Sequence, residues 1–216
     1  MKNRLNVKNL VLMAMLAAVA YMLVALIRIP VVLFLSYEPK DVVITIGGFL
    51  LGPMASFIVS LVVALVEMVT ISTTGPIGAL MNLLSSAAFA CSAAYIYKHK
   101  RSMTGAILGL AAGSVAMVVI MLLWNWLITP LYLGVPREQV EGMLIPAFLP
   151  FNALKAGFNS ALTLMLYKPL VAALRKTGLV PSRPGKAGSK KWGLYLLAAA
   201  LLATCVLFLL VMRGII

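Results

Sequence analysis

The sequence predicts an all-α integral membrane protein, and three observations carry that prediction. Of the 216 residues, 63% are apolar and only 11% are charged, whereas soluble domains carry about 25% charged residues. The apolar residues form seven stretches, most of them close to the ~20 residues that a membrane-spanning helix needs. Lys and Arg number 18 against 5 Asp and Glu, which in so apolar a chain is typical of cytoplasmic loops. The composition therefore excludes an ordinary cytosolic enzyme and predicts contact with a lipid bilayer rather than with nucleic acid.

The membrane-spanning helices can be placed by their apolar runs and by the breakers between them. Gly52-Pro53 divides one uncharged run into two helices. The helix of residues 104–133 is long enough to tilt or to bend near Pro130, and Pro150 stands where a first helical residue is favoured. The expected helices are 10–27, 42–51, 54–71, 76–97, 104–133, 150–175 and 192–212.

The segments between these helices indicate the domain organisation. Residues 34–41 and 134–142 are read as polar loops, and residues 179–191 are rich in Pro, Gly, Ser and Lys, as expected of a linker. The prediction is one membrane domain over residues 1–178, a basic cytoplasmic linker over 179–191, and an extra C-terminal transmembrane helix within 192–216.

The charges predict an orientation. With a cytoplasmic N-terminus and seven alternating spans, 13 of the 18 Lys and Arg fall on the cytoplasmic side. Four of the five acidic residues then fall outside, namely Glu38, Asp41, Glu138 and Glu141. Because cytoplasmic loops accumulate Lys and Arg, we expect a multi-pass protein of the cell membrane with its N-terminus in the cytoplasm.

The residues that several kinds of chemistry require are not found in this sequence. The one Gly-Lys pair, Gly185-Lys186, lies in the basic linker and does not continue as a phosphate-binding loop. The single histidine stands beside a basic cluster, and no pair of carboxylates or set of metal ligands is evident. Glu67 lies inside a span and has no partner that the sequence identifies. We therefore expect no catalytic residues, no metal and no ATPase in this chain, but a membrane protein that binds a ligand.

Polar residues inside the spans predict where that ligand binds. Asn152, Lys155 and Asn159 are spaced by three and four residues and share one helix face. Asn82 lies about two turns into its helix, and Asn125 stands between Trp124 and Trp126. Intramembrane polar groups are costly and are functional by default. The alternatives are a lysine that reaches outward to the membrane surface, asparagines that join neighbouring helices, and tryptophans that belong to an interfacial belt.

Together these side chains predict a neutral-to-cationic pocket near the outer ends of three helices. Asparagine amides offer both donors and acceptors, and aromatic neighbours offer stacking surface. This chemistry suits a small polar organic ligand better than an ion. The loop of residues 34–41 contains Ser36, Tyr37 and Lys40 and could close over the pocket; the alternative is a solvated turn.

The first helix carries a pattern of small residues. Ala14 and Ala18 are four residues apart, next to Ala17, and form a flat stripe that admits close helix approach. The stripe indicates either ordinary internal packing or a docking face for another membrane subunit.

These motifs resemble a known family, the substrate-binding S components of energy-coupling factor (ECF) vitamin transporters, and among them most closely the riboflavin-specific ones. The resemblance covers residues 8–175. It rests on the alanine stripe, the 36–41 loop, the 47–53 break, residues 75–82 and, as the most specific motif, residues 150–155.

The resemblance implies a six-helix S-component bundle that binds riboflavin with high affinity near the extracellular face, as transported ligand rather than cofactor. By the same resemblance, Ala14 and Ala18 face a transmembrane coupling (T) subunit, and ATP hydrolysis on two ATP-binding subunits topples the bundle so that its site opens inward. The extra C-terminal helix has no counterpart in the family pattern. The implied ligand contacts are Asn82, Asn125, Asn152 and Lys155, together with Ser36, Tyr37, Lys40 and Trp124.

Other functions stay open at this point. The chain could be an S component for another vitamin, such as thiamin or biotin. It could also be a stand-alone facilitator or channel, or a membrane enzyme that uses Glu67.

Overall fold

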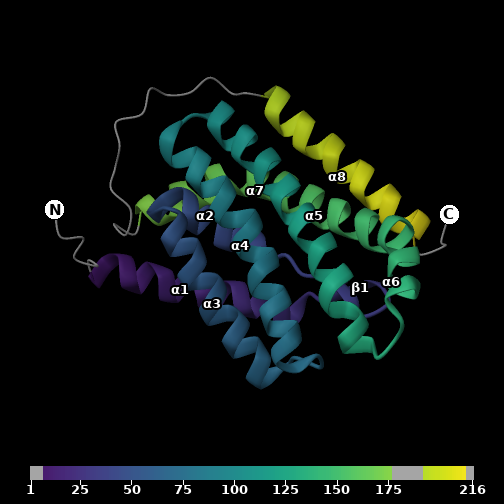
Figure 1. Cartoon of the computed structure of the whole chain (residues 1–216). Coiled ribbons are helices and arrows are strands. Elements are labelled where there is room, and N and C mark those ends of the chain that lie inside the picture. Colours follow the sequence, from purple (N-terminus) through teal and green to yellow (C-terminus); the bar gives the residue numbers. More distant parts are fainter. Residues whose placement is uncertain (1–6, 177–191, 213–216) are drawn as a thin grey trace.

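The computed structural model describes residues 7–176 and 192–212. Figure 1 shows long helices packed side by side, with a short β-hairpin at one end of the bundle. In chain order the elements are α1 (Val7–Leu26), β1 (Ile29–Val32), β2 (Leu35–Tyr37), α2 (Lys40–Leu51), α3 (Pro53–Thr70), α4 (Gly75–His99), α5 (Met103–Leu133), α6 (Arg137–Met143), the π-helix η1 (Leu144–Phe148), α7 (Leu149–Lys176) and α8 (Trp192–Met212).

Each helix expected from an apolar run is present. The break between α2 and α3 falls at Gly52, whose φ of 104° is a backbone conformation that side chains disfavour, and Pro53 opens α3. The extra C-terminal helix is observed as α8. The predicted linker of residues 179–191 lies outside the described residues.

The expectation of a polar loop over residues 134–142 is wrong in part, because α6 forms there. Gly134 caps α5 in a left-handed conformation, and α6 begins three residues later. The polar side chains of α6 fold back on α5: Glu141 accepts a hydrogen bond from Trp126 Nε1 at 2.8 Å, and the Arg137 guanidinium lies 4.9 Å from the Trp126 ring centre. These contacts with α5 stabilise a helix too short to be recognised from its own sequence.

Pro150 is not the first helical residue, contrary to the sequence prediction. It is the second residue of α7, and η1 runs directly into that helix. A proline lacks the N–H that an α-helix uses, and its ring clashes with the carbonyl four residues back. The wider π-turn before Pro150 accommodates this residue without ending the helix. Asn152 consequently lies in the interior of a continuous helical segment instead of at its exposed beginning.

The β-hairpin was not predicted. β1 and β2 are antiparallel, with Ile29 opposite Tyr37 and Pro30 opposite Ser36, and an irregularity follows Pro30. Leu33, at the turn, has a φ of 50°. Strands of four and three residues are too short to be recognised from alternation in the sequence, so the segment resembled a loop.

The bundle is held together at its centre by α4, which packs against α2, α3 and α5. Small residues allow α4 and α5 to approach closely. A methyl group added to Gly109 would lie 2.6 Å from the Ala93 carbonyl oxygen, so glycine is required for this contact. Ala90, Ala93 and Phe89 on α4 are fully buried. α7 packs against α5 and α2 and thereby brings its polar face to the centre of the molecule.

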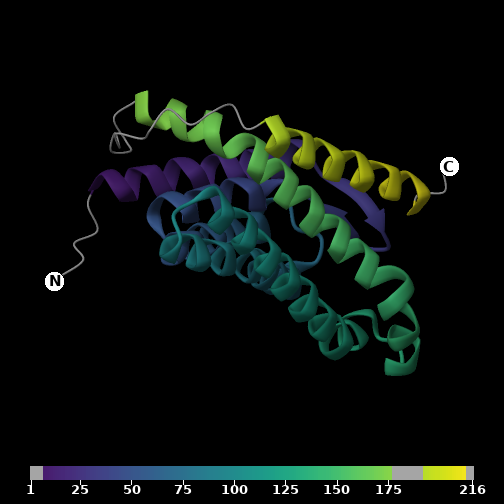
Figure 2. The same ribbon diagram turned by 90° about the horizontal axis from the view of Figure 1, so that it is seen from above.

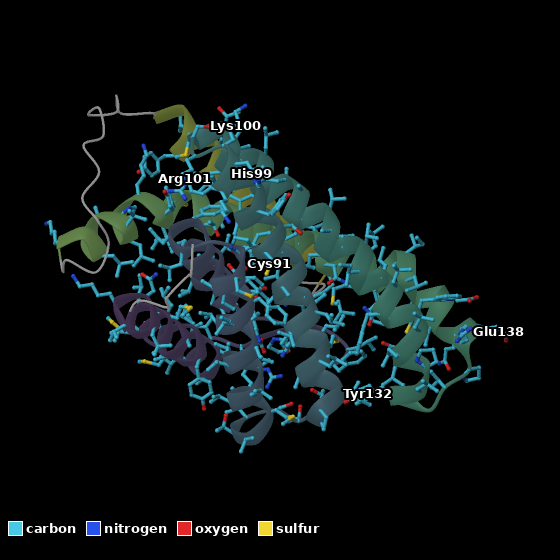
Figure 3. The ribbon with its side chains drawn as sticks, turned by 60° about the vertical axis from the view of Figure 1, so that its left-hand side comes forward. Cys91, His99, Lys100, Arg101, Tyr132 and Glu138 are labelled. Atoms are coloured by element: carbon cyan, nitrogen blue, oxygen red, sulfur yellow. The ribbon has the colours of Figure 1, made fainter. Side chains whose placement is uncertain are left out.

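Among the residues that the structure describes, four helices are long and apolar enough to cross a membrane, namely α1, α3, α4 and α5. Much of their outward surface consists of exposed Val, Leu, Ile and Met side chains, as expected of a surface in contact with lipid. α8 packs along α7 on the outside of the bundle (Figures 1 and 2). Figure 3 places the basic residues His99, Lys100 and Arg101 at the opposite end of the molecule from Tyr132 and Glu138, which is the separation that the predicted orientation requires.

Candidate functional site

A cavity with a volume of about 30 Å³ and a mouth open to solvent lies beneath the β-hairpin. Its walls come from α4, α5 and α7, and residues of the hairpin segment close it from one side. Asn82 stands near the beginning of α4 and Asn125 in the second half of α5, so the cavity lies toward the end of the bundle that carries Tyr132 and away from the basic cluster (Figure 3). Its lining is Arg28, Phe34, Leu35, Ser36, Glu38, Thr74, Met81, Asn82, Ser85, Met121, Asn125, Phe151, Asn152 and Lys155.

Five of the eight residues assigned to the ligand share this cavity. They are Ser36, Asn82, Asn125, Asn152 and Lys155, from four separate segments of the chain. The three and four residue spacing on α7 does place Asn152, Lys155 and Asn159 together, and all three are buried. The geometry therefore brings the predicted polar groups to one place, and their contact with a ligand stays a prediction.

The other three residues lie next to the cavity and outside its lining. Tyr37 is buried and donates a hydrogen bond to Asn159 Oδ1 at 3.2 Å. Lys40 is buried in an ion-pair network and is only 1% exposed. Trp124 lines a neighbouring apolar pocket together with Phe34 and Met81. Trp126, on the other side of Asn125, contacts α6.

The segment of residues 34–41 is not a solvated turn. Glu38, Lys40 and Asp41 are at most 3% exposed, although their charges suggested an external loop. Burial of so many charges is tolerated only when each has partners. Two chains of contacts supply them, and each includes one residue of the first turn of α2.

The first chain runs from the hairpin to α3. Arg28 Nε lies 3.2 Å from Glu38 Oε1, and Glu38 Oε2 lies 2.9 Å from Lys40 Nζ. Lys40 Nζ also donates to both carboxylate oxygens of Glu67 at 2.7 Å. Glu67, which had no partner in the sequence analysis, in turn accepts a hydrogen bond from Asn82 Nδ2 at 3.1 Å. The chain thus ends on the cavity wall.

The second chain runs from Asp41 to α4 and α7. Asp41 is fully buried; it accepts hydrogen bonds from Ser86 Oγ and, at 3.0 Å, from Asn159 Nδ2. Lys155 Nζ lies 3.6 Å from Asp41 Oδ2 and donates to Ser85 Oγ at 3.3 Å. This chain also ends on the cavity wall, at Lys155.

The two chains contain three cations and three anions, so their charges balance. The cations are Arg28, Lys40 and Lys155, and the anions are Glu38, Asp41 and Glu67. The network ties the hairpin to α3, α4 and α7 across the closed side of the cavity, and it leaves a site without a large net charge. Within residues 7–176 and 192–212, no cluster of His, Cys, Asp or Glu has the arrangement of a metal site.

Two of the cavity asparagines are held by their own helices. Asn125 Nδ2 donates to the Met121 carbonyl at 2.7 Å, and its Oδ1 accepts from Thr129 Oγ1 at 2.9 Å. Asn152 Nδ2 donates to the Phe148 carbonyl at 2.7 Å. Such bonds fix the rotamers of both side chains before any ligand arrives, which reduces the ordering cost of binding.

Sequence reasoning missed several residues of the cavity. Ser85 lies three residues after Asn82, Met121 four residues before Asn125, and Phe151 four residues before Lys155, so all three could have been found from helical spacing. Arg28 carried no such signal. Phe34 belongs to the hairpin and lies 5.6 Å from the Tyr132 ring, centre to centre, which closes the apolar side of the site.

Glu38 makes the network sensitive to acid. Burial raises the pKa of this carboxyl group, but the attraction of Lys40, Lys155 and Arg28 outweighs it and lowers the pKa below the ordinary value of 4.5. The ionised form therefore stabilises the folded protein above the unfolded-state pKa, and this contribution is lost as the pH falls through the folded-state pKa.

We expect Glu38→Gln to lower the unfolding temperature by a constant amount above about pH 5, and by progressively less as the pH falls further. Thermal unfolding in detergent, compared with the wild type at each pH, measures this difference. A difference that persists undiminished at about pH 3 would contradict the assignment, because Glu38 of the unfolded chain is then protonated and the advantage of the ionised form in the folded protein has begun to be lost.

The alanine stripe of α1 faces outward. Ala14 and Ala18 are exposed, whereas Ala17 packs in the core at 7% exposure. Ordinary internal packing therefore does not account for Ala14 and Ala18.

A helical bundle with an apolar outer surface and a hairpin over a polar cavity is suited to binding a small molecule. Comparison with known proteins identifies the class: the model of the ECF transporter substrate-specific component matches residues 8–167. The chain belongs to this family. With several long apolar helices in its described part, it is a multi-pass membrane protein.

Individual relatives point to the same family. The chain is 29% identical to the riboflavin transporter RibU of Staphylococcus aureus (strain TCH60) over 178 residues, covering 78% of this chain and 93% of the relative. It is 25% identical to the riboflavin transporter FmnP of Bacillus subtilis (strain 168), covering 70% and 85%. Among solved structures, the S component of a bacterial ECF transporter superposes with a TM-score of 0.66 at 31% identity, covering 78% of this chain and 98% of that one.

Proposed function

We propose that this protein captures riboflavin with high affinity in the cavity beneath the hairpin and is the substrate-binding subunit of an ECF-type importer. The observation that carries the proposal is the convergence of three asparagines, Ser36 and Lys155 on one cavity. The similarity to two proteins named riboflavin transporters supports it.

The chemistry of the cavity suits a flavin. The flat ring system carries an N–H, carbonyl oxygens and ring nitrogens, which match amide groups and a lysine ammonium, and the sugar-alcohol chain carries hydroxyl groups. Phe34 and Phe151 supply apolar surface for the rings. The ligand is neutral, as is the sum of the ion-pair network around it. In this role riboflavin is the transported substrate, and the chain itself uses no cofactor.

Partner subunits would supply the energy. A T subunit would dock on the outward stripe of Ala14 and Ala18, because small residues allow two helices to approach closely. Two ATP-binding subunits attached to the T subunit would hydrolyse ATP. The N-terminus would lie in the cytoplasm, which leaves the cavity toward the outer surface of the cell.

A ligand panel tests the substrate. Purified protein in mild detergent is titrated with riboflavin, thiamin and biotin, and riboflavin binding is followed by quenching of its own fluorescence. We expect saturable binding of riboflavin alone. Thiamin is a cation that Lys155 and Arg28 repel, and biotin offers no large aromatic surface. Binding of thiamin or biotin in preference to riboflavin would overturn the assignment.

A transport assay tests the dependence on partners. In lipid vesicles that contain this protein alone, we expect riboflavin binding without accumulation inside. Uptake in the absence of any ATPase subunit would indicate a stand-alone facilitator instead.

A further inference from the structure

Two buried residues act on the cavity although neither lines it. Lys40, at the beginning of α2, and Glu67, on α3, are 1% and 3% exposed. The Lys40 ammonium lies 2.7 Å from both Glu67 oxygens. This contact favours the ionised form of Glu67, because protonation would leave the buried ammonium with fewer partners. The pair is connected to the cavity at two points: Lys40 pairs with Glu38 of the lining, and Glu67 Oε2 accepts a hydrogen bond from Asn82 Nδ2.

That hydrogen bond determines which way the Asn82 amide faces. An ionised carboxylate can only accept hydrogen bonds, so the nitrogen of the amide must be the atom that meets Glu67. The opposite orientation would place the amide oxygen against a carboxylate oxygen, which is repulsive. The amide oxygen of Asn82 is therefore turned away from Glu67, toward the side on which Asn82 lines the cavity.

The other two cavity asparagines have the same polarity. Asn125 and Asn152 donate from Nδ2 to main-chain carbonyls, which are also acceptors only. All three amides thus use one N–H on the protein. The Asn125 oxygen also accepts from Thr129 Oγ1, but an amide oxygen has two lone pairs, so each of the three can still accept from a ligand. The main chain sets this polarity at Asn125 and Asn152. At Asn82 it is set by the side chains of Glu67 and Lys40, which can be changed by mutation.

We propose that Glu67, with Lys40, is a positioning residue that fixes the hydrogen-bonding polarity of Asn82, so that this wall of the cavity selects a ligand group that donates a hydrogen bond. The inference deepens the proposed function and rests on it for the choice of riboflavin as probe. It assigns a role to a buried ion pair that would otherwise serve only to hold α2 against α3.

Exchanging the amide of Asn82 with the carboxylate of Glu67 tests the proposal. Asn82→Asp alone sets two carboxylates against each other, and Glu67→Gln alone frees the Asn82 amide to reverse. We expect each single variant to weaken riboflavin binding by about tenfold, within the range of couplings between contacting residues.

The double variant Asn82→Asp with Glu67→Gln restores the pairing in reverse. The new amide at position 67 donates to the new carboxylate at position 82, and its oxygen can still accept from Lys40, whose charge Glu38 also balances. A carboxylate oxygen still faces the cavity, and the total charge is unchanged. The affinity of this variant for riboflavin should return to within about threefold of the wild type.

Two further measurements separate positioning from mere structural support. Asn9→Asp, the same substitution at an exposed position of α1, should leave the affinity unchanged. The unfolding temperatures of the ligand-free wild type, the two single variants at positions 67 and 82, and the double variant form a second double-mutant cycle. If the double variant regains its unfolding temperature but not its affinity, the pair only supports the structure and the proposal is overturned. If neither quantity recovers, the two residues are not coupled and the proposal is overturned as well.

If the proposed function is wrong, the binding and unfolding measurements give a different pattern. Wild-type protein that does not bind riboflavin would overturn the choice of ligand. The cycle of unfolding temperatures then still decides whether Glu67 fixes the Asn82 amide: recovery in the double variant supports that orientation, and additive losses contradict it.

Discussion

Replacing Lys155 with methionine is expected to weaken riboflavin binding by about 10- to 100-fold. A hydrogen bond to a charged group contributes about 1.5–3 kcal/mol, and every 1.4 kcal/mol corresponds to about tenfold in affinity. Lys155 is the one cation of α7 that lines the cavity in the described part of the chain, and its ammonium can donate to a carbonyl oxygen or ring nitrogen of the flavin. Methionine keeps much of the length and apolar volume of the side chain, so the loss reports on the ammonium group.

The matched control for this variant is Lys168→Met on the same helix. Lys168 is exposed and its ammonium lies 5.9 Å from the ring centre of Tyr195, far from the cavity lining. Titration of riboflavin fluorescence against both variants provides the comparison. An affinity of Lys155→Met within threefold of the control would show that Lys155 only balances the charge of Asp41.

Replacing Asp41 with alanine is expected to cost about 3–5 kcal/mol of stability, the usual effect of removing one partner of a buried ion pair. Asp41 is fully buried and receives contacts from Ser86, Asn159 and Lys155. Its removal leaves a buried ammonium with one hydroxyl partner and two polar side chains without their acceptor. It also removes a negative charge from the first turn of α2, where the helix dipole favours one.

The double variant Asp41→Ala with Lys155→Met isolates the cause of that loss. Because it removes both charges, it should unfold at a higher temperature than Asp41→Ala alone. Glu138→Ala, at an exposed position of α6, is the control and should change the unfolding temperature little. A double variant less stable than Asp41→Ala would contradict the charge argument.

The helices could be predicted because lipid imposes a strong local constraint. An apolar run of about 20 residues has few structures other than a spanning helix, and Gly52-Pro53 breaks such a run by its own backbone preferences. The polar face of α7 was predictable for the same reason, since the spacing of Asn152, Lys155 and Asn159 acts within one helix. Convergence of that face with Asn82 and Asn125 followed from their depth in the membrane.

Long-range pairing could not be predicted. Lys40 and Glu67 are 27 positions apart in the sequence, and nothing local to either residue identifies the other. The charges of residues 38–41 suggested an exposed loop, because burial of charge is rare without partners that only the fold supplies. Lys40 was assigned to the ligand, whereas in the fold it pairs with Glu38, which lines the cavity, and with Glu67, which accepts a hydrogen bond from Asn82.

Short elements were missed because their stability comes from neighbours. α6 has one buried residue, Val140, and depends on contacts with Trp126. The hairpin strands are stabilised by the side chains that line the cavity and by the ion-pair network beneath them. Pro150 was misplaced because a proline can lie at the beginning of a helix or follow a π-turn, and the sequence alone does not distinguish the two.

The central claim is that this cavity holds riboflavin, and the visible absorption spectrum of the protein tests it most directly. Protein purified in mild detergent from cells grown with riboflavin should carry the absorption bands of a flavin, released on denaturation as unmodified riboflavin. The Lys155→Met variant, purified in parallel, should carry much less. A colourless wild-type protein that also fails to quench the fluorescence of added riboflavin would contradict the account.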